Sequence, residues 1–261
     1  MTLASPLDDL IAPAADLARL TGDIALGYYR SNLAVETKAD GSPVTVADRA
    51  AEMAAREWVG RFFPDDGLLG EEFGEERPGA RRRWIIDPID GTKSFVHGAP
   101  LWGSLVALCE GDRVLVGAAY FPAIGEMLAA APGAGCWWNE SRCSVSTVSD
   151  LAQATVLTTD PQFRERPACR AGWERVAEAA IMSRTWGDCF GYLLVATGRA
   201  EAMLDSIMSP WDAAALQPII EEAGGQFSDW SGRATAFGGS TVATNAALGD
   251  VIRGLLTEPG Q

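Results

Sequence analysis

Two aspartates that follow an apolar run are the residues of this sequence best suited to chemistry. The run from Trp84 to Ile86 leads directly into residues 87–92, which read DPIDGT. A buried strand over the run would bring Asp87 and Asp90 to its carboxyl edge, where open sheets commonly bind ligands. The proline between them cannot donate to a ladder and is predicted to stop the strand. The glycine and threonine that follow predict a turn or helix start whose free amides attract an anion such as phosphate.

Two interpretations of this segment are open. Carboxylates this close together are costly unless a cation intervenes, and their hard oxygens suit Mg²⁺, which predicts a metal site that handles a phosphate. Alternatively, Asp87 and Asp90 form an Asx turn that ends the strand, as is common in sequences of this type. The choice depends on acidic residues elsewhere in the chain.

The composition limits the partners of the protein. The 261 residues, 48% of them hydrophobic, can fill the core of one large domain or two modest ones. With 35 acidic against 21 basic residues, the net charge of −14 argues against nucleic acid and anionic membranes as partners. No apolar run is long enough to span a membrane, so we expect a cytoplasmic protein. Five scattered cysteines without a CxxC pair favour reduced thiols.

The first half of the chain must position the two aspartates, and its pattern predicts two helices against a largely antiparallel sheet. An amphipathic helix is expected over residues 7–29, interrupted or kinked near Pro13, and a second helix begins at residues 44–48. Thr45 is a plausible N-cap with Asp48 as the acidic member of a capping box. Further strands are expected at 68–69, 104–110, 113–120, 126–130 and 135–138.

From about residue 151 short strands and helices alternate, which indicates an α/β second half. We therefore expect an N-terminal α+β half over residues 1–150 and a C-terminal half over residues 151–261, with a shared cleft. The predicted strands are 154–158, 184–186, 202–204, 226–228 and 242–244. The predicted helices are 168–182, 190–196, 211–223 and a last helix to about 256.

Other acidic residues have ordinary explanations when each is taken alone. Asp48 can close a capping box, and Glu71 lies in an acidic stretch of the kind that is usually solvated. Asp212 would lie in the first turn of a helix, where it complements the helix dipole. Together with Asp87 and Asp90, however, they form an ordered set of five carboxylates.

The chain resembles the inositol monophosphatase superfamily, a group of Mg²⁺-dependent, Li⁺-sensitive phosphatases, over nearly all of its length. Four signatures in the order of that family carry the resemblance: Asp48 after Ser42-Pro43-Val44-Thr45, the triplet Gly70-Glu71-Glu72, the segment 87–92, and Trp211-Asp212 leading into Glu222-Ala223-Gly224-Gly225. The resemblance implies a layered αβαβα sandwich, part α+β and part α/β, that usually forms a homodimer and holds its metals between the two halves.

The resemblance also implies a set of metal ligands. Glu71, Asp87 and the backbone carbonyl of Ile89 correspond to ligands of a first Mg²⁺. Asp87, Asp90 and Asp212 correspond to ligands of a second. Metals 3.5 to 4 Å apart typically clamp the attacking and leaving oxygens of a phosphate ester, which fits hydrolysis without a covalent phospho-enzyme.

A third, weaker Mg²⁺ would use Glu71 and, through water, Asp48, so that two or three Mg²⁺ are expected, with Mn²⁺ as a substitute. Glu71 and Thr92 would orient the attacking water, and Thr92 would hydrogen-bond Asp48, which makes these three the implied catalytic residues. The amides of Gly91 and Thr92 would hold the phosphate oxygens, and Asp212 would lie beside the substrate.

Residues at the rim of the pocket select the alcohol. Residues 93–95, 186–192 and 201–205 look like the histidinol-phosphate phosphatase branch of the family. Asp205 occupies the place of an acidic substrate contact, and Asp205 and Asp188 could pair with the ammonium and imidazole of histidinol phosphate. Alternatively, Asp188 caps the helix that begins near residue 190 and Asp205 only ends a strand.

The sequence therefore predicts Mg²⁺-dependent hydrolysis of L-histidinol phosphate to L-histidinol and phosphate, a reaction of histidine biosynthesis. An inositol-1-monophosphatase or a broad sugar or polyol phosphatase is the alternative within the family. A non-catalytic metal- or phosphate-binding protein on the same fold is the alternative outside it. The expected partners are a small phosphate monoester and a second copy of the chain, without nucleic acid or membrane.

Overall fold

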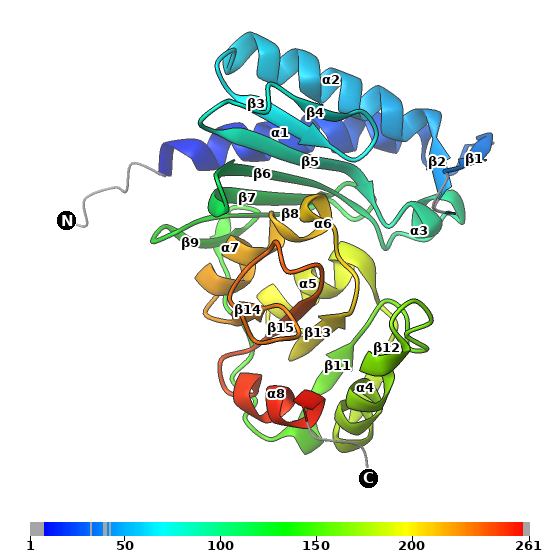
Figure 1. Cartoon of the computed structure of the whole chain (residues 1–261), viewed down its shortest axis with the longest axis vertical. Coiled ribbons are helices and arrows are strands. Elements are labelled where there is room, and N and C mark those ends of the chain that lie inside the picture. Colours follow the sequence, from blue (N-terminus) through cyan, green and yellow to red (C-terminus); the bar gives the residue numbers. More distant parts are fainter. Residues whose placement is uncertain (1–7, 32, 39–40, 42, 258–261) are drawn as a thin grey trace.

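An eight-stranded sheet is the largest element of the computed structural model, which describes residues 8–31, 33–38, 41 and 43–257 (Figure 1). Its strand order is β10-β9-β8-β7-β6-β5-β3-β4. β3 pairs in parallel with β5, and the other neighbours pair antiparallel. The strands are β3 (Gly67–Gly70), β4 (Gly74–Glu76), β5 (Arg83–Asp90), β6 (Gly103–Glu110), β7 (Arg113–Phe121), β8 (Glu126–Ala131), β9 (Gly135–Trp138) and β10 (Ser141–Arg142).

Consecutive apolar residues, whose side chains alternate between the two faces, let this sheet pack on both faces. Trp84 and Ile86 of β5 belong to the cluster formed with α1 (Asp8–Tyr28) and α2 (Val46–Phe62), which lie together along one face (Figure 1). Ile85, between them in sequence, packs in the opposite cluster with α5 (Asp188–Ala196) and α7 (Leu216–Glu222). Successive side chains of a strand point to opposite faces, so one apolar run serves both layers.

A second sheet of five strands follows in the order β12-β11-β13-β15-β14. β11 pairs in parallel with β12 and β13, whereas β15 pairs antiparallel with β13 and β14. Its strands are β11 (Thr155–Leu157), β12 (Met182–Arg184), β13 (Ala202–Asp205), β14 (Gln226–Ser228) and β15 (Thr241–Thr244).

This sheet also packs on both faces, which completes five layers. Met203 of β13 packs with α5 and α7, whereas Ala202 and Leu204 pack with α4 (Pro167–Ala179) and α8 (Gly249–Thr257). The layers therefore run helix, sheet, helix, sheet, helix, and the predicted αβαβα sandwich is confirmed. Because one apolar cluster joins both sheets through α5 and α7, the division at residue 150 stays a prediction.

The prediction that Pro88 stops its strand is wrong, because β5 continues to Asp90. The pairing of β5 with β6 shifts register between Asp87 and Asp90, so the proline occupies an irregular stretch that needs no ladder donor from it. Its carbonyl accepts a hydrogen bond of 2.6 Å from Ser104 Oγ of β6. The irregularity brings both aspartates to one end of the strand while keeping them in the sheet.

Other boundaries also differ from the predicted ones. α1 continues without interruption through Pro13, because the buried residues that follow, such as Leu17, hold the helix on the sheet. The predicted helix 211–223 is two helices, α6 (Pro210–Ala213) and α7. Short strands β1 (Val35–Thr37), β2 (Pro43–Thr45) and β4 were not predicted.

Some predictions concern residues 7, 39, 40 and 42, which lie outside the described part of the chain. They include Ser42 of the first signature and the first residue of the helix expected over residues 7–29. Across the described residues, no helix is long and apolar enough to cross a membrane. All five cysteines are described and none forms a disulfide with another.

Candidate active site

Three carboxylates from distant parts of the chain meet at the end of β5. One oxygen each of Asp87, Asp90 and Asp212 lies within 4.8 Å of the other two. Asp87 and Asp90 come from the irregular end of β5, and Asp212 comes from α6. The sheet and the helix layer beneath it thus bring together residues that are more than a hundred positions apart.

Local hydrogen bonds fix the direction of each carboxylate. Asp87 Oδ1 accepts from the Ile89 amide at 2.9 Å, and Asp90 accepts from the Cys189 amide at the start of α5. Asp212 Oδ2 accepts from the Ser209 amide at 2.7 Å and closes a capping box with it. The helix-start interpretation of Asp212 is therefore correct, and a carboxylate oxygen of the same side chain lies near the other two acids.

The cluster carries more negative charge than its surroundings can offset. Burial first, and neighbouring carboxylates second, raise the pKa values of Asp87 and Asp90 well above their usual range. Burial also raises the pKa of Asp212 to about 7. A hard divalent cation would remove this repulsion, and carboxylate oxygens are the ligands that Mg²⁺ prefers. The donor set therefore fits the metal that the sequence predicts.

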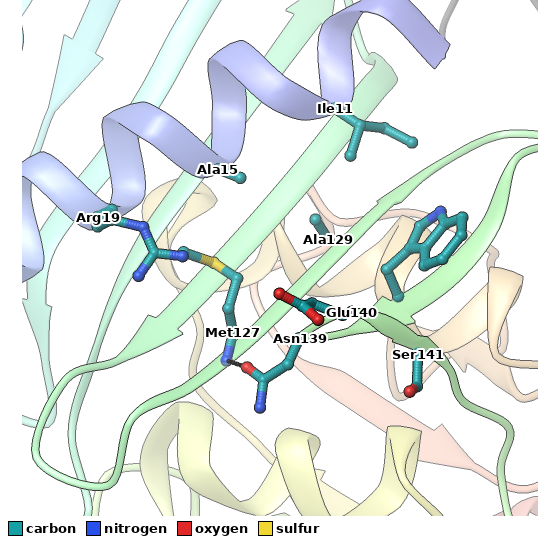
Figure 2. Close-up of a pocket in the computed structure, with 9 residues that line it drawn as sticks. Ile11, Ala15, Arg19, Met127, Ala129, Asn139, Glu140 and Ser141 are labelled. Atoms are coloured by element: carbon teal, nitrogen blue, oxygen red, sulfur yellow. Dashed lines mark hydrogen bonds between the residues drawn. The ribbon is translucent and has the colours of Figure 1, made fainter.

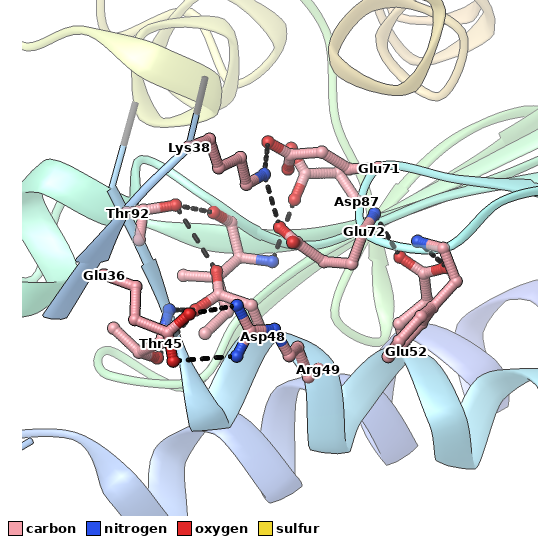
Figure 3. A network of polar contacts seen from close by, with 12 residues as sticks. Glu36, Lys38, Thr45, Asp48, Arg49, Glu52, Glu71, Glu72, Asp87 and Thr92 are labelled. Carbon is pink, nitrogen blue, oxygen red and sulfur yellow. Dashed lines mark hydrogen bonds and ion pairs between the residues drawn. The ribbon is translucent and has the colours of Figure 1, made fainter. Parts of the chain in front are cut away.

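Glu71 lies near Asp87, in the turn after β3 (Figure 3). Its carboxylate contributes to the raised pKa values of Asp87 and Asp212, after burial in each case. Lys38 Nζ lies 2.7 Å from Glu71 Oε1 and 2.6 Å from Glu72 Oε1. Lys38 thus supplies a positive charge at the rim of the cluster, and sequence reasoning assigned it no role.

Glu52, which was also missed, holds the turn that carries Glu71. Its fully buried carboxylate accepts from the amides of Glu72 at 2.7 Å and Phe73 at 3.2 Å. Arg56 Nη2 pairs with it at 2.7 Å. A Cβ at Gly70 would overlap this carboxylate, which explains the glycine before the two glutamates. An acid on the apolar face of a predicted helix, four residues before an arginine, was the available signal.

Asp48 closes the predicted capping box and accepts the predicted hydrogen bond from Thr92. Asp48 Oδ2 accepts from Thr45 N at 2.8 Å and from Thr45 Oγ1 at 2.6 Å in the capping box of α2. Its other oxygen accepts from Thr92 Oγ1 at 3.4 Å, which confirms the expected hydrogen bond (Figure 3). Thr92 Oγ1 also lies 3.0 Å from the Ile89 carbonyl, so this hydroxyl connects two of the implied metal-site groups.

Gly91 is required where the chain turns from β5 into α3 (Thr92–Val96). Its φ is 85°, and a Cβ there would lie 2.8 Å from the Leu101 carbonyl and 3.1 Å from Asp188 Oδ2. Asp188 therefore lies directly beside this turn. It makes no side-chain cap for α5, so the capping interpretation of Asp188 is wrong. Burial first, and Asp205 next, raise the pKa of Asp188 to about 6.

Asp205 ends β13, as the alternative interpretation expected, but its side chain is also precisely held. Its carboxylate accepts from the Thr159 amide at 3.0 Å and from Tyr192 Oη at 3.0 Å. The Tyr192 side chain is fully buried, so this hydrogen bond holds the Asp205 carboxylate in place. Burial raises the pKa of Asp205.

A cavity of about 480 Å³ opens beside Asp205 and is also lined by Lys93 and Thr159. A larger cavity of about 630 Å³ lies between α1 and the β8–β9 side of the sheet (Figure 2). Its lining includes Ile11 and Met127 but none of the five acids of the sequence pattern. None of the five acids lines the smaller cavity either, but Asp205 does, and its charge helps, after burial, to raise the pKa values of Asp188 and Asp212, so this cavity is the one connected with the acidic cluster.

Comparisons with known proteins agree on one family. A family model described as the inositol monophosphatase family matches residues 7–257. A histidinol-phosphatase from Chlorobaculum parvum is 45% identical over 238 residues, which are 90% of this chain and 92% of that protein. Another from Mycobacterium tuberculosis is 38% identical over 250 residues, covering 94% and 96%. The solved structure of an inositol monophosphatase from Zymomonas mobilis matches with a TM-score of 0.87 at 32% identity, over 98% of this chain and 100% of that one.

Proposed function

The chain belongs to the inositol monophosphatase family and is a phosphoric monoester hydrolase, and from this premise we propose that it hydrolyses L-histidinol phosphate to L-histidinol and phosphate. The observation that carries the proposal is the meeting of Asp87, Asp90 and Asp212 within 4.8 Å, together with a cavity that is lined by the buried acid Asp205. The acidic cluster supports metal-dependent phosphate chemistry, and the acid in the cavity supports a substrate whose alcohol part is basic.

The acidic cluster and Glu71 would hold two or three Mg²⁺, with the Ile89 carbonyl as a further ligand and Asp48 acting through water. When bound, Mg²⁺ supplies charge stabilisation to the attacking and leaving oxygens of the ester. Burial raises the pKa values of Asp87 and Asp90, and a bound cation would favour their ionised forms.

The chain itself would position the water and the phosphate. Glu71 and Thr92 would orient the water that attacks phosphorus, and the hydrogen bonds of Thr92 Oγ1 to Asp48 and to the Ile89 carbonyl hold that hydroxyl in place. The amides of Gly91 and Thr92 would bind phosphate oxygens. No side chain needs to form a covalent phosphoryl bond in this arrangement.

The proposed substrate follows from the acids next to the cluster. Histidinol phosphate carries an ammonium group and a basic imidazole, and Asp205 and Asp188 would face them with two carboxylates. The histidinol-phosphatases among the relatives support the same choice. A second candidate, an inositol or polyol phosphate, is favoured by the similarity to a solved inositol monophosphatase structure.

Turnover of histidinol phosphate, inositol 1-phosphate and fructose 1,6-bisphosphate with Mg²⁺ tests the proposal. We expect the highest kcat/KM for histidinol phosphate. A preference for inositol 1-phosphate of tenfold or more, about 1.4 kcal/mol of transition-state discrimination, would overturn the substrate assignment. Loss of all three activities would instead favour a non-catalytic binding protein.

Several finer points belong to the same proposal. Mg²⁺ as the natural metal, Mn²⁺ as a substitute, inhibition by Li⁺ and a homodimer rest on the family resemblance. The division into halves at residues 1–150 and 151–261 is supported by the two sheets. A cytoplasmic location is supported by the five thiols, since a reducing compartment keeps them unpaired.

A further inference from the structure

The cavity beside Asp205 has a wall that no sequence motif identified. Residues 158–165, which connect β11 to α4, form one side of it, and residues 205–207 after β13 form another. Lys93 of α3 completes the lining near the turn proposed to bind phosphate. β11 and β13 are parallel neighbours, and the carboxyl ends of such strands are where open sheets bind ligands.

This wall is built by its own hydrogen bonds and packing. The Asp160 carboxylate accepts from the amides of Gln162 and Arg164, both at 3.0 Å. Phe163 has a φ of 47° and is 2% exposed, with ring centroids 6.2 Å from Trp173 and 5.6 Å from Trp230. A bulky residue adopts this backbone conformation only where its surroundings impose it, and such positions gather at ligand sites.

Arg166 ties the two sides of the cavity together. Its Nη1 donates to the Ser206 carbonyl at 3.0 Å, so the start of α4 is held against the residues after β13. The shape of the cavity is therefore set before a ligand binds.

Several polar groups of the lining, among them the Lys93 ammonium, have no hydrogen-bond or ion-pair partner among the described residues. The Glu165 carboxylate is exposed and makes no hydrogen bond or ion pair with any described residue, whereas Asp160 and Asp205 are both engaged. The hydroxyl of Thr158, a residue that is 1% exposed, also lacks a partner among the described residues. A buried hydroxyl without a partner is costly, and a ligand in the cavity would supply one.

We propose that this cavity receives the alcohol part of the substrate and that Glu165 determines specificity by pairing with its ammonium or imidazolium group. The hydroxyl of Thr158 hydrogen-bonds the same part of the substrate. This inference rests on the proposed function and adds two residues to it. The cavity then selects phosphate esters of cationic alcohols over phosphate esters of neutral alcohols.

Steady-state kinetics of Glu165→Gln with Mg²⁺ test the inference, because the variant removes the charge and keeps the shape. We expect KM for histidinol phosphate to rise about fivefold, as for a partly exposed ion pair, with kcat little changed. KM for inositol 1-phosphate should stay the same. Glu57→Gln removes an exposed charge on α2, away from the cavity lining, and is the matched control for net charge.

The dependence of KM on salt concentration distinguishes an ion pair between Glu165 and the substrate from a structural effect of the substitution. Raising NaCl from about 0.05 M to about 0.5 M should narrow the KM difference between Glu165→Gln and the wild type, because exposed charges are screened. Thr158→Val should also raise KM for histidinol phosphate without lowering Tm, since the valine replaces an unpartnered hydroxyl.

Equal KM values for Glu165→Gln and Glu57→Gln on histidinol phosphate would overturn the inference and leave the proposed function standing. An equal rise in KM for both substrates would also overturn it, because a contact with the cation cannot affect a neutral alcohol. Failure of the wild type to hydrolyse histidinol phosphate, with inositol 1-phosphate still hydrolysed, would overturn the proposed function itself.

Discussion

Replacing Asp90 by asparagine should separate the function of the acidic cluster from the stability of the protein. At the 4.8 Å limit that joins the three carboxylates, two full charges repel by about 3.5 kcal/mol at an effective dielectric constant of about 20. Asp90→Asn removes this repulsion with both Asp87 and Asp212. Asparagine keeps a carbonyl oxygen that can accept from the Cys189 amide.

Without metal, the stability that Asp90→Asn gains is smaller than the full repulsion energy. Because the pKa values of Asp87 and Asp90 are raised well above their usual range, protonation relieves part of this repulsion in the metal-free protein. We expect the variant to gain about 2 kcal/mol in free energy of unfolding at pH 8 with EDTA, a rise in Tm of about 4 to 8 °C. With Mg²⁺ at about 100 times its Kd, the wild type should gain about 2.7 kcal/mol and the variant much less.

Thermal unfolding with EDTA and with Mg²⁺, together with phosphate release, measures both effects. Activity of Asp90→Asn should fall about 10³-fold or more, because several kcal/mol of charge stabilisation depend on the metal that Asp90 would bind. Asp112→Asn in the exposed turn between β6 and β7 is the control for loss of one acid. The electrostatic argument would be refuted if Asp90→Asn were less stable than the wild type in EDTA. It would also be refuted if Mg²⁺ stabilised Asp90→Asn as strongly as it stabilises the wild type.

Three further predictions follow from the same contacts. Because burial raises the pKa of Asp212 to about 7 and that of Asp188 to about 6, both from 3.8, the stability that their protonation contributes is fully present below pH 3.8 and is lost as pH rises through 6 to 7. Urea unfolding with EDTA should show that the free energy of unfolding falls with rising pH, and Mg²⁺ should make this fall less steep. A dependence of the unfolding free energy on pH that Mg²⁺ does not change would contradict the prediction. Thr92→Val removes the hydroxyl that contacts Asp48 and the Ile89 carbonyl, so kcat should fall about 10²-fold with little change in the Mg²⁺-induced rise in Tm. Glu52→Ala leaves Arg56 without its buried partner and should cost about 3 kcal/mol, or roughly 6 to 12 °C in Tm; a change below about 2 °C would mean that this pair does not hold the Glu71 turn.

Local patterns predicted much of the fold. The apolar run 84–86, the strands predicted at 104–110 and 113–120, and the capping box of Thr45 and Asp48 each depend on neighbours in sequence, and the structure contains all of them. Their predicted positions are accurate because backbone conformation and burial of alternating side chains are decided within a few residues. The predicted end of the β5 strand was wrong, because the register shift between Asp87 and Asp90 depends on pairing with β6. No local rule describes that pairing.

The sequence by itself determined which residues could do chemistry: five acids in a family's order, a glycine-threonine turn after a strand, and two further acids near the rim. Only the tertiary structure decided that Asp212 meets Asp87 and Asp90, that Glu52 holds the turn of Glu71, and that residues 158–165 enclose a cavity. The physical reason is that these contacts arise from the packing of whole layers. Apolar periodicity specifies that a strand or helix must bury one face, whereas the partner it buries that face against is chosen by the fit of all the layers together.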